Sequence, residues 1–159
     1  MKINKLTFFL LFFVFIAKSQ SISHISAKNI DGKTISLSTL DDDKPLVISF
    51  WATWCLPCLE ELNTINEKID EEKIARDFNF VAVSIDDPRT VNKVKTLVNA
   101  KNWNFDEILL DSSQSIKRQL NVNNVPYTLV YYKDKVIYSH VGYTPGDEEE
   151  LFEKLKTIQ

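Results

Sequence analysis

The sequence predicts an α/β sandwich, a central mixed sheet with helices on both faces. Two continuous apolar runs, 45–51 and 80–85, are rich in β-branched and aromatic residues, as expected of strands buried on both faces. Each run is followed by apolar residues at helical spacing, first over 55–75 and then from Asp87 onward. The alternation of strand and helix along one chain of 159 residues predicts a single α/β domain.

The other elements are predicted in order from turn residues and spacing. Asp31-Gly32 lies between two short alternating runs and predicts an N-terminal hairpin over 29–35. Asp87-Pro88 predicts a helix start with Pro88 in the first turn. A strand, a short helix, a hairpin with its turn at 133–135 and a last amphipathic helix complete the prediction, over 107–110, 113–120, 127–138 and 147–157.

The N-terminus has the pattern of a secretory signal peptide. Lys2 and Lys5 precede an apolar run over 6–17, and small residues flank Lys18 at the expected cleavage site. The run is shorter than the roughly 20 residues that a membrane-spanning helix needs. We therefore expect residues 1–19 to be a signal peptide or an uncleaved anchor, residues 20–159 to form the domain, and the protein to be exported to the periplasm or the outer face of the cytoplasmic membrane.

The charge of the expected domain excludes one class of partner. Residues 1–19 contain three lysines and no acids, which leaves 16 basic and 22 acidic side chains in residues 20–159. The acidic residues are scattered, and no basic patch suited to nucleic acid is present. No nucleic-acid partner is expected.

Cys55 and Cys58 are the only cysteines, and only two residues separate them. A structural disulfide over so short a loop would stabilise the chain by roughly 2 kcal/mol in the chain-entropy model, which a domain of this size hardly needs. A structural zinc site needs four ligands, and the only histidines, His24 and His140, are distant in sequence. The third alternative, a redox centre, fits the position of the pair better, and no metal or bound cofactor is expected.

The pair lies where a predicted buried strand ends and a helix begins. Unpaired amide groups and the positive end of the helix dipole favour an anion at the helix N-terminus, which lowers the pKa of a thiol. Pro57 is tolerated there because its missing N–H has no partner to lose. We expect Cys55 to attack a substrate disulfide and the deeper Cys58 to resolve the mixed disulfide.

The stretch Phe50-Trp51-Ala52-Thr53-Trp54-Cys55-Leu56-Pro57-Cys58, with Val125-Pro126-Tyr127-Thr128 about seventy residues later, resembles the active site of the thioredoxin superfamily. It is most similar to the exported TlpA/ResA-like thiol–disulfide oxidoreductases. The resemblance implies a thioredoxin-like sandwich with an added N-terminal β-hairpin. It also implies that Pro126 is a cis-proline facing the disulfide and that Val125 pairs with the substrate backbone.

Glu61 occupies the position of a glutamate typical of the TlpA-like pattern, three residues after the second cysteine. Helical geometry places Glu61 on the same face as Cys58, so a partly buried carboxylate there can exchange a proton with that cysteine. A solvated helix acid is the alternative. Two positions depart from related patterns: Ser49 stands where thioredoxins have a buried aspartate, and Asn63 stands where the TlpA-like family often has a proline.

The resemblance implies a protein-disulfide reductase that works by dithiol–disulfide exchange. Trp54 and Pro57, beside the thiol, are expected to contact substrate together with Val125 and Pro126. The implied partners are proteins that carry thiols or disulfides, such as apocytochromes c, and a thiol-transporting electron donor in the membrane. A disulfide oxidant or isomerase, a peroxiredoxin-type peroxidase and a non-enzymatic binding protein remain as alternatives; in the peroxidase pattern a Thr takes the place of Ala52.

Overall fold

The computed structural model of the chain describes residues 22–40, 43–75 and 78–158. The expected signal peptide, residues 1–19, lies outside the described residues. Over the described ranges, no helix combines the length and the apolar character needed to cross a membrane.

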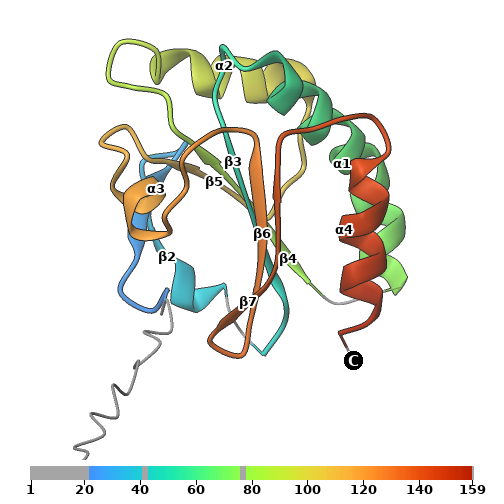
Figure 1. Cartoon of the computed structure of the whole chain (residues 1–159). Helices are drawn as coiled ribbons and strands as arrows, with labels where there is room; N and C mark the ends of the chain where they lie inside the picture. Colours follow the sequence, from blue (N-terminus) through green and yellow to red (C-terminus); the bar gives the residue numbers. More distant parts are fainter. Residues whose placement is uncertain (1–21, 41–42, 76–77, 159) are drawn as a thin grey trace, which may run out of the picture.

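Seven strands form one mixed sheet in the order β2-β1-β5-β4-β3-β6-β7 (Figure 1). The pairs β3–β4 and β4–β5 are parallel, while β6 and β7 on one side and β1 and β2 on the other are added antiparallel. The strands are β1 (Ser26–Asn29), β2 (Thr34–Ser36), β3 (Leu46–Trp51), β4 (Asn79–Ser84), β5 (Glu107–Leu110), β6 (Tyr127–Tyr132) and β7 (Lys135–Val141).

Four α-helices pack around the sheet in the described part of the chain. Figure 1 shows α1 and α4 lying side by side at one face, and α3 at the opposite face. This confirms the thioredoxin-like sandwich with helices on both faces. The helices are α1 (Leu56–Ala75), α2 (Asn92–Lys101), α3 (Ser115–Gln119) and α4 (Asp147–Lys156), and a short 3-10 turn, η1 (Leu37–Thr39), follows β2.

The central strands are buried on both faces, as their continuous apolar sequences predict. Every residue of β3 is buried, and so are all residues of β4 except Asn79. On one face Trp51 meets Trp103 edge to face at 5.0 Å between ring centroids. Because the core holds β3 on both sides, the loop that leaves its carboxyl end starts from a rigid support.

The start of α2 was predicted wrongly. The helix begins at Asn92 and not at Asp87-Pro88. The Asp87 carboxylate accepts hydrogen bonds from the amides of Arg89 (2.9 Å) and Thr90 (3.2 Å), and its carbonyl accepts from the Val91 amide. These local hydrogen bonds satisfy the backbone amides of residues 89–91 in a turn. Such local bonds are the usual way in which aspartate competes with helix formation.

The last hairpin is longer than predicted on one side. Pairing with β6 extends β7 to Val141, well beyond residue 138. The added residues include Ser139 and His140, which lack the apolar character by which strands are recognised in sequence. As a result, His140 lies opposite Thr128 in the sheet.

The predicted N-terminal hairpin is present and adds to the sheet through β5. Its turn is held by Asn29, whose side-chain oxygen accepts from the amides of Asp31 and Lys33, each at 3.0 Å. The Asn29 amide group donates to the Glu107 carboxylate of β5 at 3.0 Å. One buried side chain therefore both shapes the turn and attaches the hairpin to the sheet.

Replacing Asn29 by alanine removes all three bonds and leaves the Asp31 and Lys33 amides without their acceptor. We expect Asn29→Ala to lower the free energy of unfolding by about 1–3 kcal/mol. Urea denaturation measures the change, and Lys33→Ala, an exposed position of the same turn, is the control with little effect. Equal stability of the two variants would contradict this role of Asn29.

Candidate active site

Cys55 and Cys58 lie at the junction of β3 and α1 and form a disulfide, with 5.3 Å between their Cα atoms. The Cys55 amide donates to the Ala52 carbonyl at 3.1 Å, which closes a tight turn after the strand. The Cys55 carbonyl accepts from the Leu59 amide at 3.2 Å. Cys55 therefore directly precedes α1, which begins at Leu56.

The two sulfur-bearing side chains differ in accessibility as predicted. Cys55 is 7 % exposed and Cys58 is fully buried at 0 %. The first turn of α1 contains no acidic residue to oppose the positive end of the helix dipole. The positive end of the α1 dipole therefore lies beside Cys55, the more exposed of the two cysteines.

A buried aspartate holds the loop that precedes the cysteines. Asp86, two residues after the end of β4, accepts from the Thr53 amide at 2.9 Å and from the Thr53 hydroxyl at 2.6 Å. The Ser84 hydroxyl donates to the same carboxylate at 2.8 Å. Because β3 and β4 are parallel, their carboxyl ends meet at one edge of the sheet, which places Asp86 beside the loop.

An apolar rim surrounds the disulfide. Trp54, Leu56 and Pro57 are exposed next to Cys55, although large apolar side chains are usually covered. The Val125–Pro126 peptide bond is cis, as the resemblance led us to expect. The pairing of Phe50 with Tyr127 places that bond beside the carboxyl end of β3, where the loop to Cys55 starts.

Glu61 is buried on the face of α1 that carries Cys58, at 5 % exposure. Its Oε1 accepts from the Thr128 hydroxyl of β6 at 2.9 Å, and its Oε2 accepts from the Ser49 hydroxyl of β3 at 3.3 Å. The alternative of a solvated helix acid is therefore wrong for Glu61, while the neighbouring Glu60 is exposed.

Burial raises the pKa of Glu61 from 4.5 to about 7. The hydrogen bonds from Thr128 and Ser49 favour the charged form and offset part of this effect, while the negative charges of Asp147 and Glu148 add to it. A carboxyl group with a pKa near neutrality can both donate and accept a proton under ordinary conditions.

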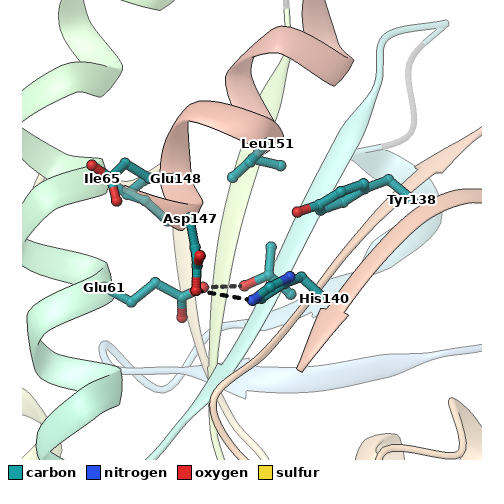
Figure 2. Close-up of a pocket in the computed structure, with 8 residues that line it drawn as sticks. Glu61, Ile65, Tyr138, His140, Asp147, Glu148 and Leu151 are labelled. Atoms are coloured by element: carbon teal, nitrogen blue, oxygen red, sulfur yellow. Dashed lines mark hydrogen bonds and ion pairs between the residues drawn. The ribbon is translucent and has the colours of Figure 1, made fainter. Parts of the chain in front are cut away.

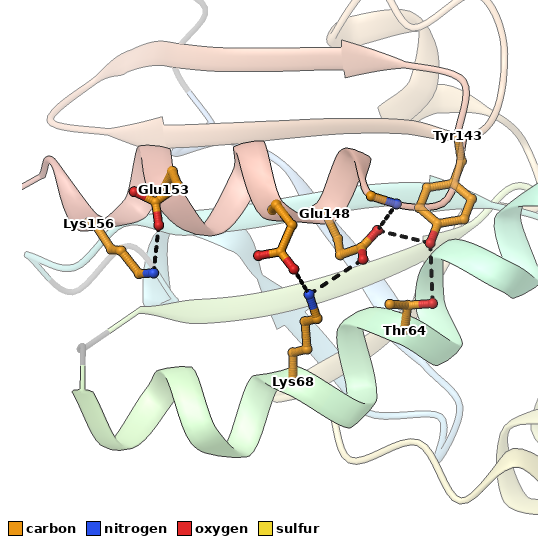
Figure 3. A network of polar contacts seen from close by, with 8 residues as sticks. Thr64, Lys68, Tyr143, Glu148, Glu153 and Lys156 are labelled. Atoms are coloured by element: carbon orange, nitrogen blue, oxygen red, sulfur yellow. Dashed lines mark hydrogen bonds and ion pairs between the residues drawn. The ribbon is translucent and has the colours of Figure 1, made fainter.

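The first turn of α4 lies near Glu61 on the same face of the sheet as α1 (Figure 2). Glu148 is held there in the network of Figure 3: it accepts from the Tyr143 hydroxyl and the Gly146 amide, each at 3.0 Å, and pairs with Lys68 at 3.5 Å. Lys68 also pairs with Glu149. These bonds join α4 to α1 and fix the acidic groups near Glu61.

The departure at Asn63 has a structural use. Helix α1 continues through this position, and the Asn63 side-chain oxygen accepts from the Trp103 indole N–H at 3.0 Å. Trp103 in turn packs against Trp51 at the end of β3. A proline at position 63 would lack this acceptor. In this chain, therefore, the asparagine holds the Trp103 side chain by a hydrogen bond.

The sequence-predicted residues come together at one end of the sheet, and four further residues were missed. Thr128 was noted in the motif but given no role. In the pairing of β6 with β3 it lies opposite Ser49, so the two side chains point to the same face of the sheet. Asp86 could have been found from the sequence, because it is an acidic residue at the end of the predicted buried strand 80–85. His140 and Asp147 gave no such indication because their positions depend on the register of β7 and the packing of α4. Among the described residues, no cluster of three or more His, Cys, Asp or Glu could hold a metal ion.

Comparison with known proteins agrees with this geometry. The profile of the AhpC/TSA family matches residues 19–140. The thiol–disulfide oxidoreductase ResA of Bacillus thuringiensis (strain Al Hakam) is 30% identical over 131 residues, which are 82% of this chain and 72% of ResA. The thioredoxin-like protein YneN of Bacillus subtilis (strain 168) is 32% identical over 137 residues, 85% of this chain and 78% of YneN.

A solved structure extends the comparison to three dimensions. The solution structure of a thioredoxin-like protein from Porphyromonas gingivalis superimposes with a TM-score of 0.72 and 40% identity, covering 84% of this chain and 88% of that one. The fold and the cysteine pair thus define a redox enzyme of the thioredoxin-like class. The chain belongs to the AhpC/TSA family of this fold, as a TlpA/ResA-like thiol–disulfide oxidoreductase.

Removing the Thr53 hydroxyl tests the attachment of the active-site loop. Thr53→Val keeps the shape of the side chain but leaves one oxygen of the buried Asp86 carboxylate without its donor. We expect a loss of about 1.5–3 kcal/mol in unfolding free energy, the range for a hydrogen bond to a charged group. Thr157→Val, at an exposed threonine that bonds to a helix carbonyl, is the matched control. An equal loss in both variants would argue against the attachment.

The raised pKa of Glu61 makes stability depend on pH with a definite sign. The native state holds this proton more tightly than the unfolded chain, so the contribution is complete below about pH 4.5 and is lost as pH rises through about 7. Gln does not ionise, so its contribution does not change with pH. Between pH 4.5 and about 7 we expect the unfolding free energy of the wild type to fall by about 3 kcal/mol relative to that of Glu61→Gln. Denaturation at several pH values measures the difference, and Glu60→Gln should show none of this trend.

Proposed function

We propose that this chain is an exported thiol–disulfide oxidoreductase that reduces disulfides in other proteins. The observation that supports it best is the arrangement of one slightly exposed cysteine at a helix N-terminus, a fully buried partner cysteine and a buried carboxyl group on the same helix face. A disulfide that served only to stabilise the chain would need neither this asymmetry nor Glu61.

In the proposed reaction the reduced enzyme attacks first through Cys55. The Cys55 thiolate attacks one sulfur of the substrate disulfide, which breaks that bond and forms a mixed disulfide; the departing substrate sulfur leaves as a thiolate and takes a proton from water. Trp54, Pro57, Val125 and Pro126 would receive the substrate around this sulfur. The exposed apolar rim suits an unfolded or extended segment, whose side chains are not covered.

The second step gives Glu61 its role. The Cys58 thiol transfers its proton to Glu61, and the resulting thiolate attacks Cys55 Sγ. The Cys55–Cys58 disulfide forms, and the second substrate sulfur is released. Two electrons have then moved from the enzyme to the substrate. A dithiol donor restores the enzyme by the reverse sequence, in which Glu61 gives a proton to Cys58.

Export and the partners are proposed from the sequence and from its similarity to known proteins. The lysines and apolar run of residues 1–19 favour export. The similarity to the thiol–disulfide oxidoreductase ResA supports proteins with thiols or disulfides as substrates. The reductive role, the thiol-transporting donor in the membrane and targets such as apocytochromes c are what the resemblance of the active-site motif implies. Disulfides persist in oxidising compartments, so a reductase has substrates there.

A peroxidase is the second candidate, since the matching family is named AhpC/TSA. The Thr53 hydroxyl, the nearest equivalent of a peroxidase threonine, donates to Asp86 and is therefore engaged away from the cysteines. We expect the purified protein to consume no hydrogen peroxide above the rate of the variant that lacks Cys55.

The reduction potential of the Cys55–Cys58 pair decides the direction of electron flow. Equilibration with glutathione buffers, followed by alkylation of free thiols, should give about −250 mV or lower, close to reducing members of the superfamily. A value near −120 mV would instead identify a disulfide donor. Absence of exchange with the buffer would overturn the redox function altogether.

The targets can be trapped through the mixed disulfide. In Cys58→Ala the resolving thiol is missing, so complexes through Cys55 should accumulate and disappear on treatment with reductant. Cys55→Ala is the matched control, because the remaining Cys58 is buried and should trap little. Equal trapping by the two variants would contradict the division of roles.

A further inference from the structure

The buried position of Glu61 raises the question of how its proton reaches solvent. This inference rests on the proposed function, in which Glu61 takes up and returns one proton per cycle. Glu61 is 5 % exposed, and both of its carboxylate oxygens already accept hydrogen bonds from hydroxyl groups of the sheet. A proton must therefore reach the Glu61 carboxyl group from a direction other than those of the Ser49 and Thr128 hydroxyls.

Such a direction exists toward β7 and α4. A small cavity adjoins Glu61, with room for about one water molecule. Glu61, Thr128, His140, Tyr138 and Asp147 offer it polar partners. Figure 2 shows the side chains of Glu61, Asp147 and His140 converging from three different elements.

His140 and Asp147 form a pair at the outer side of this cavity. His140 Nε2 lies 3.2 Å from Asp147 Oδ2, and the same carboxylate oxygen accepts from the Thr144 amide at 2.7 Å. The two side chains are 29% and 33% exposed, so they reach both the cavity and solvent. Asp147 thus orients a ring that is accessible from outside.

The other ionisable groups that face His140 are unsuited to carry a proton. Burial, together with the charges of Glu150, Asp147 and Glu61, raises the pKa of Tyr138 to about 12, so it stays protonated. Burial alone would raise the pKa of Glu148, but its hydrogen bonds and the Lys68 charge outweigh this, and its pKa is lowered. Glu148 therefore stays charged. Of the lining groups, imidazole is the type that exchanges protons readily near neutral pH.

We propose that His140, oriented by Asp147, is the outer end of a proton path that links Glu61 with solvent through one water molecule in the cavity. His140 does not touch the reacting sulfur atoms and acts through Glu61, so it is a positioning residue for the proton.

The number of protons that enter by the path equals the number that leave over a full catalytic cycle. When Cys58 gives its proton to Glu61 and attacks Cys55 Sγ, the proton leaves through the water and His140 to solvent. When a dithiol donor attacks Cys55 Sγ in the oxidised enzyme, Cys58 departs as a thiolate and receives a proton that enters by the same path. The protein retains no net proton, and the electrons move only between sulfur atoms.

The test is the rate at which dithiothreitol reduces the full-length protein, measured by rapid alkylation from roughly pH 5.5 to 8.5 in buffers without imidazole. Taking the ratio of variant to wild type at each pH cancels the ionisation of the reductant. We expect His140→Gln to be slower by about tenfold, less than the loss typical of a direct acid–base group. Added imidazole should restore the rate to within about twofold of wild type.

Two comparisons make the result specific. His24→Gln removes the other histidine, which is exposed, and should match wild type. The equilibrium constant with glutathione should be the same for His140→Gln as for wild type, because a path changes the rate and not the end states. A folded His140→Gln with the wild-type rate at every pH would overturn the proposal. A slow variant that imidazole does not rescue would overturn it as well.

Asp147→Asn provides a second route if His140→Gln does not fold. It keeps an oxygen acceptor for the Thr144 amide but weakens the orientation of the ring, so we expect about a threefold slower reduction with the same imidazole rescue. An unchanged rate, or a loss without rescue, counts against the path. Failure of the wild-type protein to exchange with glutathione would instead contradict the proposed function and is seen before any histidine variant is compared.

Discussion

The arrangement of this protein depends on burying an ionisable carboxyl group between a helix and a sheet. Glu61 on α1 is held by hydroxyl groups from the two adjacent strands β3 and β6. A charged group in such a position costs free energy unless it is bonded or protonated. The structure supplies both remedies, with two donors for the charged form and a pKa close to neutrality for the protonated one.

The carboxyl ends of the parallel strands β3 and β4 organise the structure around the cysteines. The loop to Cys55 leaves β3 where Asp86 follows β4, so one buried carboxylate can hold the loop by its backbone and by a side chain. The cis-proline loop arrives at the same edge through the antiparallel pairing of β6. Three segments distant in sequence meet there without requiring a long or irregular connection.

Much of this could be predicted from the sequence, because the features involved are local. Continuous apolar runs identified β3 and β4, the spacing of Cys58 and Glu61 placed them on one helix face, and the motif around Cys55 indicated the family. The start of α2 could not be predicted, because the choice between a capped turn and a helix at Asp87 depends on small energy differences. His140 and Asp147 were missed for another reason. Their meeting depends on strand register and helix packing, which no short stretch of sequence encodes.

The acidic start of α4 has two effects that cannot be separated. Four carboxylates in its first turn favour the helix, because they complement the positive end of its dipole. Two of them, Asp147 and Glu148, also make Glu61 harder to ionise. Substitutions in a surface helix therefore adjust the acidity at the reaction centre while the cysteines and their surroundings stay unchanged. In this chain the first turn of α4 is therefore a place where the pKa of Glu61 can be changed, at a cost in helix stability.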